Sequence, residues 1–315
     1  MELPPSPAFD PDKSVSSKPL HCYSSAGKCA WIHGKNSNCR YASLCPGYEF
    51  MFASWTTDGF TFGSTFGHLI TETMENNIPD FLIGCSNSPS RLPLGYAAFG
   101  NANQSLPSQM ALKKFSFHDG VSYPDLTYTP LFDVAVELGP HFRGYYYLKL
   151  QEIVVGDKRI AIPVEKQLPK RDGNGGTIVD TGIPFTFLER SIYEAVRHEF
   201  ENHMGNFSRA PDHGVLGTCF SSTSCQDITM VPVLSFVFDG VAKMDFPTQK
   251  YFLIDDKVGA VCLSLTTDVV GGVGPNVGLS SGPAVLLGNY LLMDSFMEFD
   301  LVNSRLGLQQ EHCDI

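Results

Sequence analysis

Gly-Thr-Ile-Val-Asp-Thr-Gly-Ile-Pro-Phe-Thr-Phe, residues 176–187, is the stretch of this chain that says most about its fold. The β-branched residues before Asp180 predict a strand. Gly182 permits a tight turn whose backbone comes back close to the Asp180 carboxylate. Thr181 offers a hydroxyl and an amide that can hold this carboxylate in one orientation. The stretch therefore predicts a strand that ends in a turn carrying one oriented carboxylate.

The composition predicts a mainly β protein. The 315 residues are enough for a large core and for one or two domains. With 29 glycines, 21 prolines and 43% hydrophobic residues, the chain suits short strands joined by many turns. The best helix signal is residues 189–204, where Ile192, Val196, Phe200 and Met204 recur at four-residue intervals.

Charge excludes one class of partner. The net charge is −11 and basic residues occur at most in pairs, so we expect no nucleic-acid binding, which needs a clustered positive surface. No apolar run reaches the roughly 18 residues of a membrane span. The first residues, Met-Glu-Leu-Pro-Pro-Ser-Pro, show neither the basic nor the apolar region of a signal peptide.

Nine cysteines favour an oxidising compartment. No C-x-x-C pair occurs, so disulfides are expected and a zinc site is not. Two N-x-S/T sequons, at Asn103 and Asn206, would permit glycosylation of a secreted chain.

Four segments resemble one family in the right order. Residues 172–182 resemble the second catalytic turn of the plant pepsin-like aspartic proteases of the nepenthesin-like kind, which reads DGNGGTIIDSGTT. Residues 79–85, 104–117 and 284–307 are similar to that family's VPNFxFGC, SLPSQ…KFSY and AxILGN…RLGF segments. The resemblance covers nearly the whole chain.

The resemblance implies an all-β, bilobal pepsin-like fold with a few short helices. We expect an N-terminal lobe at 1–141, incomplete at its start, and a C-terminal lobe at 142–315. The family activity is aspartic endopeptidase, in which two carboxylates activate a water to hydrolyse a peptide bond at acid pH, with no metal or other cofactor. The implied substrate is a polypeptide, the expected state a monomer, and the expected location the secretory pathway or the extracellular space.

The expected catalytic pair is incomplete in this sequence. Each lobe of the family has an Asp-Thr-Gly turn and a later hydrophobic pair with glycine that braces it. In the second lobe these are Asp180 and Leu286-Leu287-Gly288, 108 positions from Asp180 to Gly288. The same spacing counted back from Gly100, the first-lobe brace, falls before Met1. The internal Thr56-Thr57-Asp58-Gly59 is predicted to be a hairpin turn instead. We therefore expect a truncated or divergent member with impaired or absent activity.

Two further segments depart from the family pattern. The flap, a hairpin that closes over substrate, would lie at Phe60, Phe62, Gly63 and Ser64, and neither phenylalanine supplies the family's tyrosine hydroxyl. After Asp180, Ile183-Pro184 replaces the usual Ser or Thr that bonds the outer carboxylate oxygen.

The resemblance also implies a disulfide between Cys219 and Cys262. It leaves Cys313 without its family partner, because His118 stands at the partner's position. The alternative function is a non-catalytic pepsin-fold protein like the plant xylanase inhibitors, which hold a partner enzyme on surface loops. A homodimer built from a single Asp-Thr-Gly, of the retroviral type, is disfavoured by the second brace at Gly100.

Overall fold

A computed structural model describes residues 99–101, 105–116, 126–132, 144–171, 174–213, 216–221, 231–255, 259–267 and 282–310. It also describes the backbone of strands at 18–19, 40–43, 51–62 and 76–86. The chain forms two compact units, Met1–Lys113 with Asp119–Val121, and Lys114–His118 with Ser122–Ile315. The predicted lobe boundary near residue 141 stays a prediction.

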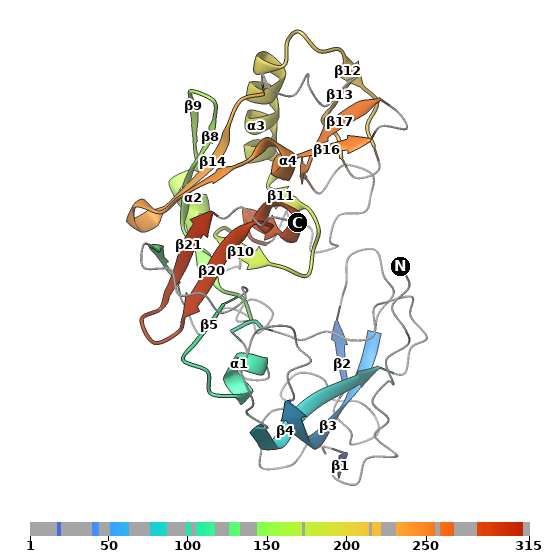
Figure 1. Ribbon diagram of the computed structural model, residues 1–315, viewed down its shortest axis with the longest axis vertical. Helices are drawn as coiled ribbons and strands as arrows, with labels where there is room; N and C mark the ends of the chain where they lie inside the picture. The colour runs from blue at the N-terminus through green and yellow to red at the C-terminus, as the bar shows by residue number, and fades with distance from the viewer. Residues whose placement is uncertain are drawn as a thin grey trace. The chain divides into compact units, whose positions relative to one another are not determined.

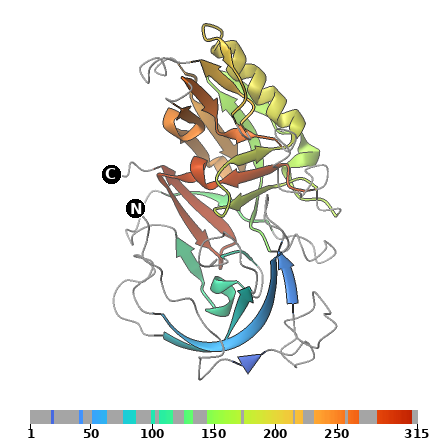
Figure 2. The same ribbon diagram turned by 90° about the vertical axis from the view of Figure 1, so that its right-hand side faces the viewer.

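The first unit is built on one long strand. Its described elements are β1 (Lys18–Pro19), β2 (Arg40–Ser43), β3 (Met51–Phe62), β4 (Asn76–Ser86) and α1 (Leu106–Gln109). Strand β3 pairs antiparallel with β1, β2 and β4, and Figure 2 shows it as a curved ribbon. Helix α1 begins after Ser105, whose hydroxyl accepts the Ser108 N–H at 3.4 Å, and Pro107 lies in its first turn.

The prediction of a hairpin turn at Thr56-Thr57-Asp58-Gly59 is wrong. These residues lie inside β3. The pairing of β3 with β4 shifts its register between Asp58 and Phe60. A strand can absorb an extra residue as a bulge, and glycine suits that place because its backbone is unrestricted. The turn-forming residues thus interrupt the register of the strand without ending it.

The described part of the second unit contains four sheets and several short helices (Figure 1). One sheet runs β18 (Leu265–Thr266), β11 (Thr186–Leu188), β19 (Val285–Gly288), β10 (Thr177–Asp180), β7 (Tyr147–Leu148). Another runs β12 (Arg209–Ala210), β13 (Cys219–Ser221), β17 (Ala260–Leu263), β16 (Phe252–Asp255). A third runs β15 (Lys243–Phe246), β14 (Leu234–Phe238), β8 (Leu150–Val155), β9 (Lys158–Ala161). The fourth runs β5 (Lys114–Ser116), β20 (Ser295–Asp300), β21 (Arg305–Gln310), β6 (Thr127–Pro130).

The helices of the second unit are mostly single turns. They are α2 (Val164–Gln167), α3 (Arg190–His203), α4 (Thr248–Tyr251), α5 (Asn289–Leu292) and the 3-10 helix η3 (Asp239–Val241). The prediction of a mainly β fold with few short helices is confirmed. None of the helices in the described ranges is long and apolar enough to cross a membrane.

Helix α3 follows the predicted pattern closely. Its buried residues include Ile192, Val196 and Phe200, and Met204 just beyond its end is also buried. The apolar side faces the protein because these residues recur at nearly one helical turn. Phe200 packs against the rings of Tyr251 and Phe252, each at 5.7 Å between centroids. In Figure 1 the helix lies beside β8 and β9, so it covers the sheet that these strands share with β14.

Three consecutive tyrosines alternate between two sides of the chain at β7. Tyr145 and Tyr147 lie on one side, edge to face, with centroids 6.5 Å apart. Tyr146 points the other way and packs against Phe115 and Phe299, at 6.1 and 4.9 Å. Tyr147 is fully buried, and its hydroxyl has no hydrogen-bond partner among the described residues. Burial, with a smaller effect of Tyr145, raises the pKa of Tyr147 to about 12.

We expect Tyr147→Phe to raise the free energy of unfolding by about 1–2 kcal/mol, because a buried hydroxyl without a partner costs about that much. Urea unfolding measures the change. The matched control is Tyr251→Phe: the Tyr251 hydroxyl donates to the Pro232 carbonyl at 2.7 Å, so its loss should lower stability by about 1 kcal/mol. An equal loss in both variants would show that the Tyr147 hydroxyl is hydrogen-bonded in solution.

Candidate active site

Asp180 ends strand β10, which lies between β19 and β7 in the five-stranded sheet. Strand β10 begins buried at Thr177 and Ile178 and reaches half-buried positions at Val179 and Asp180. It pairs in parallel with β19, so that Asp180 lies opposite Gly288. Strand β11 pairs with the other side of β19, so β19 lies between the two strands that flank the Asp180 turn. The predicted brace therefore lies directly against the turn.

Gly288 is required at this crossing. A Cβ atom at that position would lie 2.2 Å from the backbone oxygen of Phe185. The Gly288 N–H donates to the Thr186 hydroxyl at 3.0 Å, and Thr186 is fully buried. Leu286 and Leu287 precede it and are both buried. The strand can pass between β10 and β11 only because its last residue has no side chain.

The Asp180 carboxylate is held by the backbone of its own turn. The Gly182 N–H donates to Asp180 Oδ1 at 2.9 Å. A Cβ atom on residue 182 would lie 3.1 Å from that oxygen, so glycine leaves room for this close approach. Thr181 is exposed, and its hydroxyl makes no hydrogen bond to Asp180 within the described turn. The supporting role predicted for Thr181 therefore stays a prediction, whereas Gly182 supplies an amide donor to the carboxylate.

The far side of the turn is fixed to the core. Ile183 and Phe185 pack against the cluster of Tyr147, Ile178, Phe187 and Leu286. The Ile183 and Pro184 carbonyls accept the N–H groups of Asn289 and Tyr290 at 2.7 and 2.8 Å. At the position where the family carries a hydroxyl beside the outer carboxylate oxygen, this chain therefore has an apolar side chain committed to the core.

The surroundings of Asp180 favour its protonated form. Burial raises the pKa of Asp180, and the hydrogen bond from Gly182 lowers it by less, so the pKa lies above its ordinary value. Burial, and to a smaller extent the negative charge of Asp180, raise the pKa of the Tyr145 hydroxyl. Tyr145 therefore lies close to this carboxylate. Thr177 pairs with Leu148 and Ile178 with Tyr147, so the same antiparallel register continued by two residues brings Tyr145 opposite Asp180.

Sequence reasoning gave Tyr145 no role. The sequence feature that could have pointed to it is the run of three tyrosines, because Tyr145 and Tyr147 must share one face of an extended segment. What the sequence could not supply was the pairing of this segment with β10, which sets Tyr145 across from the carboxylate.

We expect Asp180→Asn to raise the melting temperature at neutral pH. The folded pKa of Asp180 is above its value of about 3.8 in the unfolded chain, so the ionised carboxylate costs stability once the pH exceeds both values. Asparagine keeps the oxygen that accepts the Gly182 N–H and carries no charge. The gain should shrink as the pH falls through the folded pKa and vanish below about 3.8.

Thermal melts from neutral to acid pH test this expectation. The control is Asp212→Asn at an exposed position, which should leave the melting temperature unchanged. A variant of Asp180 that is less stable than the parent at neutral pH would contradict the burial argument.

The remaining predicted positions are spread over the chain. Phe60 and Phe62 lie in β3, whereas Gly63, Ser64, Asn103, His118 and Cys313 lie outside the described residues. Their roles, including the flap, stay predictions. Asn206 lies on an exposed turn after α3. No group of three or more histidine, cysteine or acidic side chains placed to hold a metal occurs within the described ranges.

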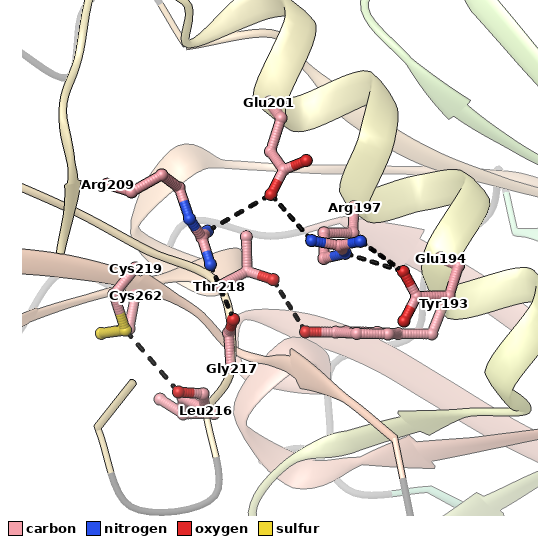
Figure 3. A network of polar contacts seen from close by, with 10 residues as sticks. All are labelled: Tyr193, Glu194, Arg197, Glu201, Arg209, Leu216, Gly217, Thr218, Cys219 and Cys262. Carbon is pink, nitrogen blue, oxygen red and sulfur yellow. Dashed lines mark hydrogen bonds and ion pairs between the residues drawn. A yellow bond between two sulfur atoms is a disulfide. The ribbon is translucent and has the colours of Figure 1, made fainter. Parts of the chain in front are cut away.

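Cys219 and Cys262 form a disulfide between paired strands. They lie directly opposite each other in β13 and β17, with Cα atoms 4.0 Å apart. Figure 3 shows the polar contacts around them: the Tyr193 and Thr218 hydroxyls are 2.7 Å apart, and Arg209 donates to the Gly217 carbonyl at 3.0 Å. The first contact joins helix α3, and the second joins strand β12, to the segment that precedes Cys219.

Comparison with known proteins agrees with this architecture. The family described as xylanase inhibitor C-terminal matches residues 145–310, and the family described as xylanase inhibitor N-terminal matches residues 3–123. Aspartic proteinase nepenthesin-2 of Nepenthes gracilis is 26% identical over 98% of this chain and 69% of its own length. Aspartyl protease family protein 2 of Arabidopsis thaliana is 27% identical over 98% of this chain and 62% of its own length.

Relatives with other names share the fold. Gamma conglutin 1 of Prunus dulcis is 27% identical over 78% of this chain and 59% of its own length. The crystal structure of conglutin gamma, a basic 7S globulin from lupine seeds, superposes with a TM-score of 0.70 at 20% identity, covering 95% of this chain and 83% of that one. The chain therefore belongs to the pepsin-like aspartic protease family, in the group defined by the xylanase-inhibitor N- and C-terminal domains.

Proposed function

We propose that Asp180 is the second-lobe catalytic carboxylate of an aspartic endopeptidase that hydrolyses polypeptides at acid pH. The observation that carries the proposal is the Asp180 turn itself, in which a partly buried carboxylate accepts the Gly182 N–H at 2.9 Å and has a raised pKa. In this chemistry one carboxylate is charged and activates water, while its neighbour is protonated and polarises the substrate carbonyl. The raised pKa suits Asp180 to the protonated role.

The chemistry needs a second carboxylate, and the 315 residues contain one Asp-Thr-Gly. Neither role can be left out, because a lone carboxylate is unable to activate water and donate a proton in the same step. The chain covers 69% of the length of nepenthesin-2 and 62% of the length of aspartyl protease family protein 2. We therefore propose that these residues alone do not cleave peptides, and that activity requires a first-lobe carboxylate supplied in addition.

A second candidate is a non-catalytic binding protein that holds a partner enzyme. What favours it is the apolar Ile183, packed into the core where the family has a hydroxyl for the outer carboxylate oxygen. Loss of that hydrogen bond would weaken the charged form of Asp180. The chain's relatives carry names of both kinds, aspartic proteinases and a conglutin.

We further propose that the protein acts as a monomer in the secretory pathway or outside the cell. The disulfide between Cys219 and Cys262 supports an oxidising compartment, because such bonds are rarely kept in the cytosol. Size-exclusion chromatography with light scattering, on protein purified without reductant, tests the monomer.

The two candidate functions differ in how the protein would respond to an added second Asp-Thr-Gly turn. An endopeptidase gains activity when it receives a second Asp-Thr-Gly turn, and that activity depends on Asp180. A binding protein with an impaired Asp180 turn stays inactive after the same addition. Cleavage of a denatured protein at acid pH, with and without pepstatin, distinguishes them.

A further inference from the structure

The turn between α3 and β12 presents a glycosylation sequon that the proposed catalytic chemistry does not use. The sequon is Asn206-Phe207-Ser208. The side chains of Asn206 and Ser208 are exposed, whereas Phe207 between them is half-buried. The Asn206 side chain makes no hydrogen bond or ion pair with any described residue. Its amide is therefore available to solvent.

The backbone of this turn is anchored on both sides. The Phe207 N–H donates to the Met204 carbonyl at 2.8 Å, and the Ser208 carbonyl accepts the Ser221 N–H at 2.8 Å. Directly after the sequon, Arg209 donates to the Gly217 carbonyl at 3.0 Å and pairs with Glu201 of α3 at 3.6 Å (Figure 3). These contacts use backbone atoms of the sequon and a neighbouring side chain. A group attached to Asn206 would displace none of them.

We propose that Asn206 carries an N-linked glycan. The donor is an oligosaccharide bound through pyrophosphate to a membrane lipid. The Asn206 side-chain nitrogen forms a bond to the first sugar carbon, the bond from that carbon to the pyrophosphate oxygen breaks, and the amide loses one proton. The lipid pyrophosphate is the leaving group, so no oxidant or reductant is needed.

The disulfide supports this proposal independently of the sequon. Cys219 and Cys262 join β13 and β17, and β12, which begins three residues after Asn206, pairs with β13. Such a bond forms in the oxidising compartment where this sugar transfer takes place. The disulfide would therefore form, and the glycan would be attached, in the same compartment.

The glycan would also lie next to a sheet edge. Among the strands that the structure describes, β12 has two residues, pairs on one side with β13 and ends the order of its sheet. Open edges invite pairing with other chains, and proteins protect them with bulky or charged groups. A large polar group three residues before β12 would serve that purpose. This inference holds whether or not Asp180 is catalytic.

The test uses the 315-residue chain directed to the secretory pathway of a plant cell host. Trypsin cleaves after Arg197 and Arg209 and so releases residues 198–209 as one peptide. We expect most of this peptide to carry a glycan that peptide N-glycosidase removes. Asn206→Gln and Ser208→Ala should abolish the modification, and Ser208→Thr should retain it, because threonine supplies the same hydroxyl.

The chain offers a matched control in the same peptide. Asn202 is exposed and lies on α3, but His203 and Met204 follow it and make no sequon. Asn202→Gln should therefore leave the glycan unchanged. Thermal melts of all variants should coincide with that of the parent, because the substituted side chains are exposed. Recovery of the unmodified peptide from secreted, disulfide-bonded protein would overturn the proposal.

Discussion

We expect the 315-residue chain to leave denatured haemoglobin intact at acid pH, and a chimera with an added Asp-Thr-Gly-Ser segment to cleave it. The chimera adds an upstream segment that has a hydrophobic strand and an Asp-Thr-Gly-Ser turn, taken from the first lobe of an active relative. Its carboxylate would supply the role that Asp180 cannot fill alone. Acid–base groups of this kind each contribute about 10²–10⁴-fold to rate, so the gain should exceed 100-fold.

The controls separate chemistry from folding. In the chimera, Asp180→Asn should abolish cleavage while leaving the protein folded, since asparagine keeps the acceptor for the Gly182 N–H. Asp212→Asn, at an exposed position, should keep full activity. Pepstatin should inhibit the active forms. The unextended chain serves as the baseline at the same pH.

Two results would contradict this expectation in different ways. Cleavage by the unextended chain that Asp180→Asn abolishes would reveal an acid partner that the sequence does not identify. A chimera that folds cooperatively and stays inactive would remove the endopeptidase proposal. In that case the leading explanation for the missing activity would be Ile183, which packs against the core where the family has a hydroxyl beside the carboxylate. The non-catalytic binding protein would then become the leading candidate function.

The second-lobe turn could be predicted because its signals are local. The β-branched strand, Asp180 and Gly182 are contiguous, and the apolar spacing that predicts residues 189–204 as a helix is read within one segment. The structure has α3 at Arg190–His203, within one residue of that range at each end. The brace at Leu286-Leu287-Gly288 needed the family resemblance, since nothing local relates it to residues 108 positions earlier.

What the sequence did not reveal depends on strand register. Tyr145 comes to lie across from Asp180 because β7 pairs with β10, and this pairing joins segments about 30 residues apart with no local marker. The prediction of a hairpin turn at Asp58-Gly59 is wrong for a related reason, because a turn-forming pair of residues can also form a bulge within a strand. Only the partner strand β4, which continues alongside, decides between the two.

The disulfide has a position that links stability to the candidate site. Cys219 and Cys262 belong to a buried cluster with Leu216, and Phe185 packs against it. Phe185 also packs against the cluster under the Asp180 turn. One side chain of the turn thus contacts both the disulfide and the core of the five-stranded sheet.

We therefore expect the double variant Cys219→Ala with Cys262→Ala to lower the free energy of unfolding by about 4 kcal/mol. The bond closes a loop with a sequence separation of 43, and in the chain-entropy model its removal restores about that much freedom to the unfolded state. Urea unfolding measures the loss, with Ser221→Ala as the control at an exposed position of the same strand, expected within about 0.5 kcal/mol of the parent.

The same variant shows how far the Asp180 turn depends on this bond. If Phe185 couples the loss of the disulfide to the Asp180 turn, the turn should loosen before the helix does. The chimera carrying the double substitution should then lose activity at urea concentrations where its circular dichroism still shows a folded α3. A parent and double variant that unfold within about 1 kcal/mol of each other would show that the bond is not formed in the purified protein, since an intact one of this loop length contributes more. Coincident loss of activity and helix would instead show that the turn and α3 unfold as one cooperative unit.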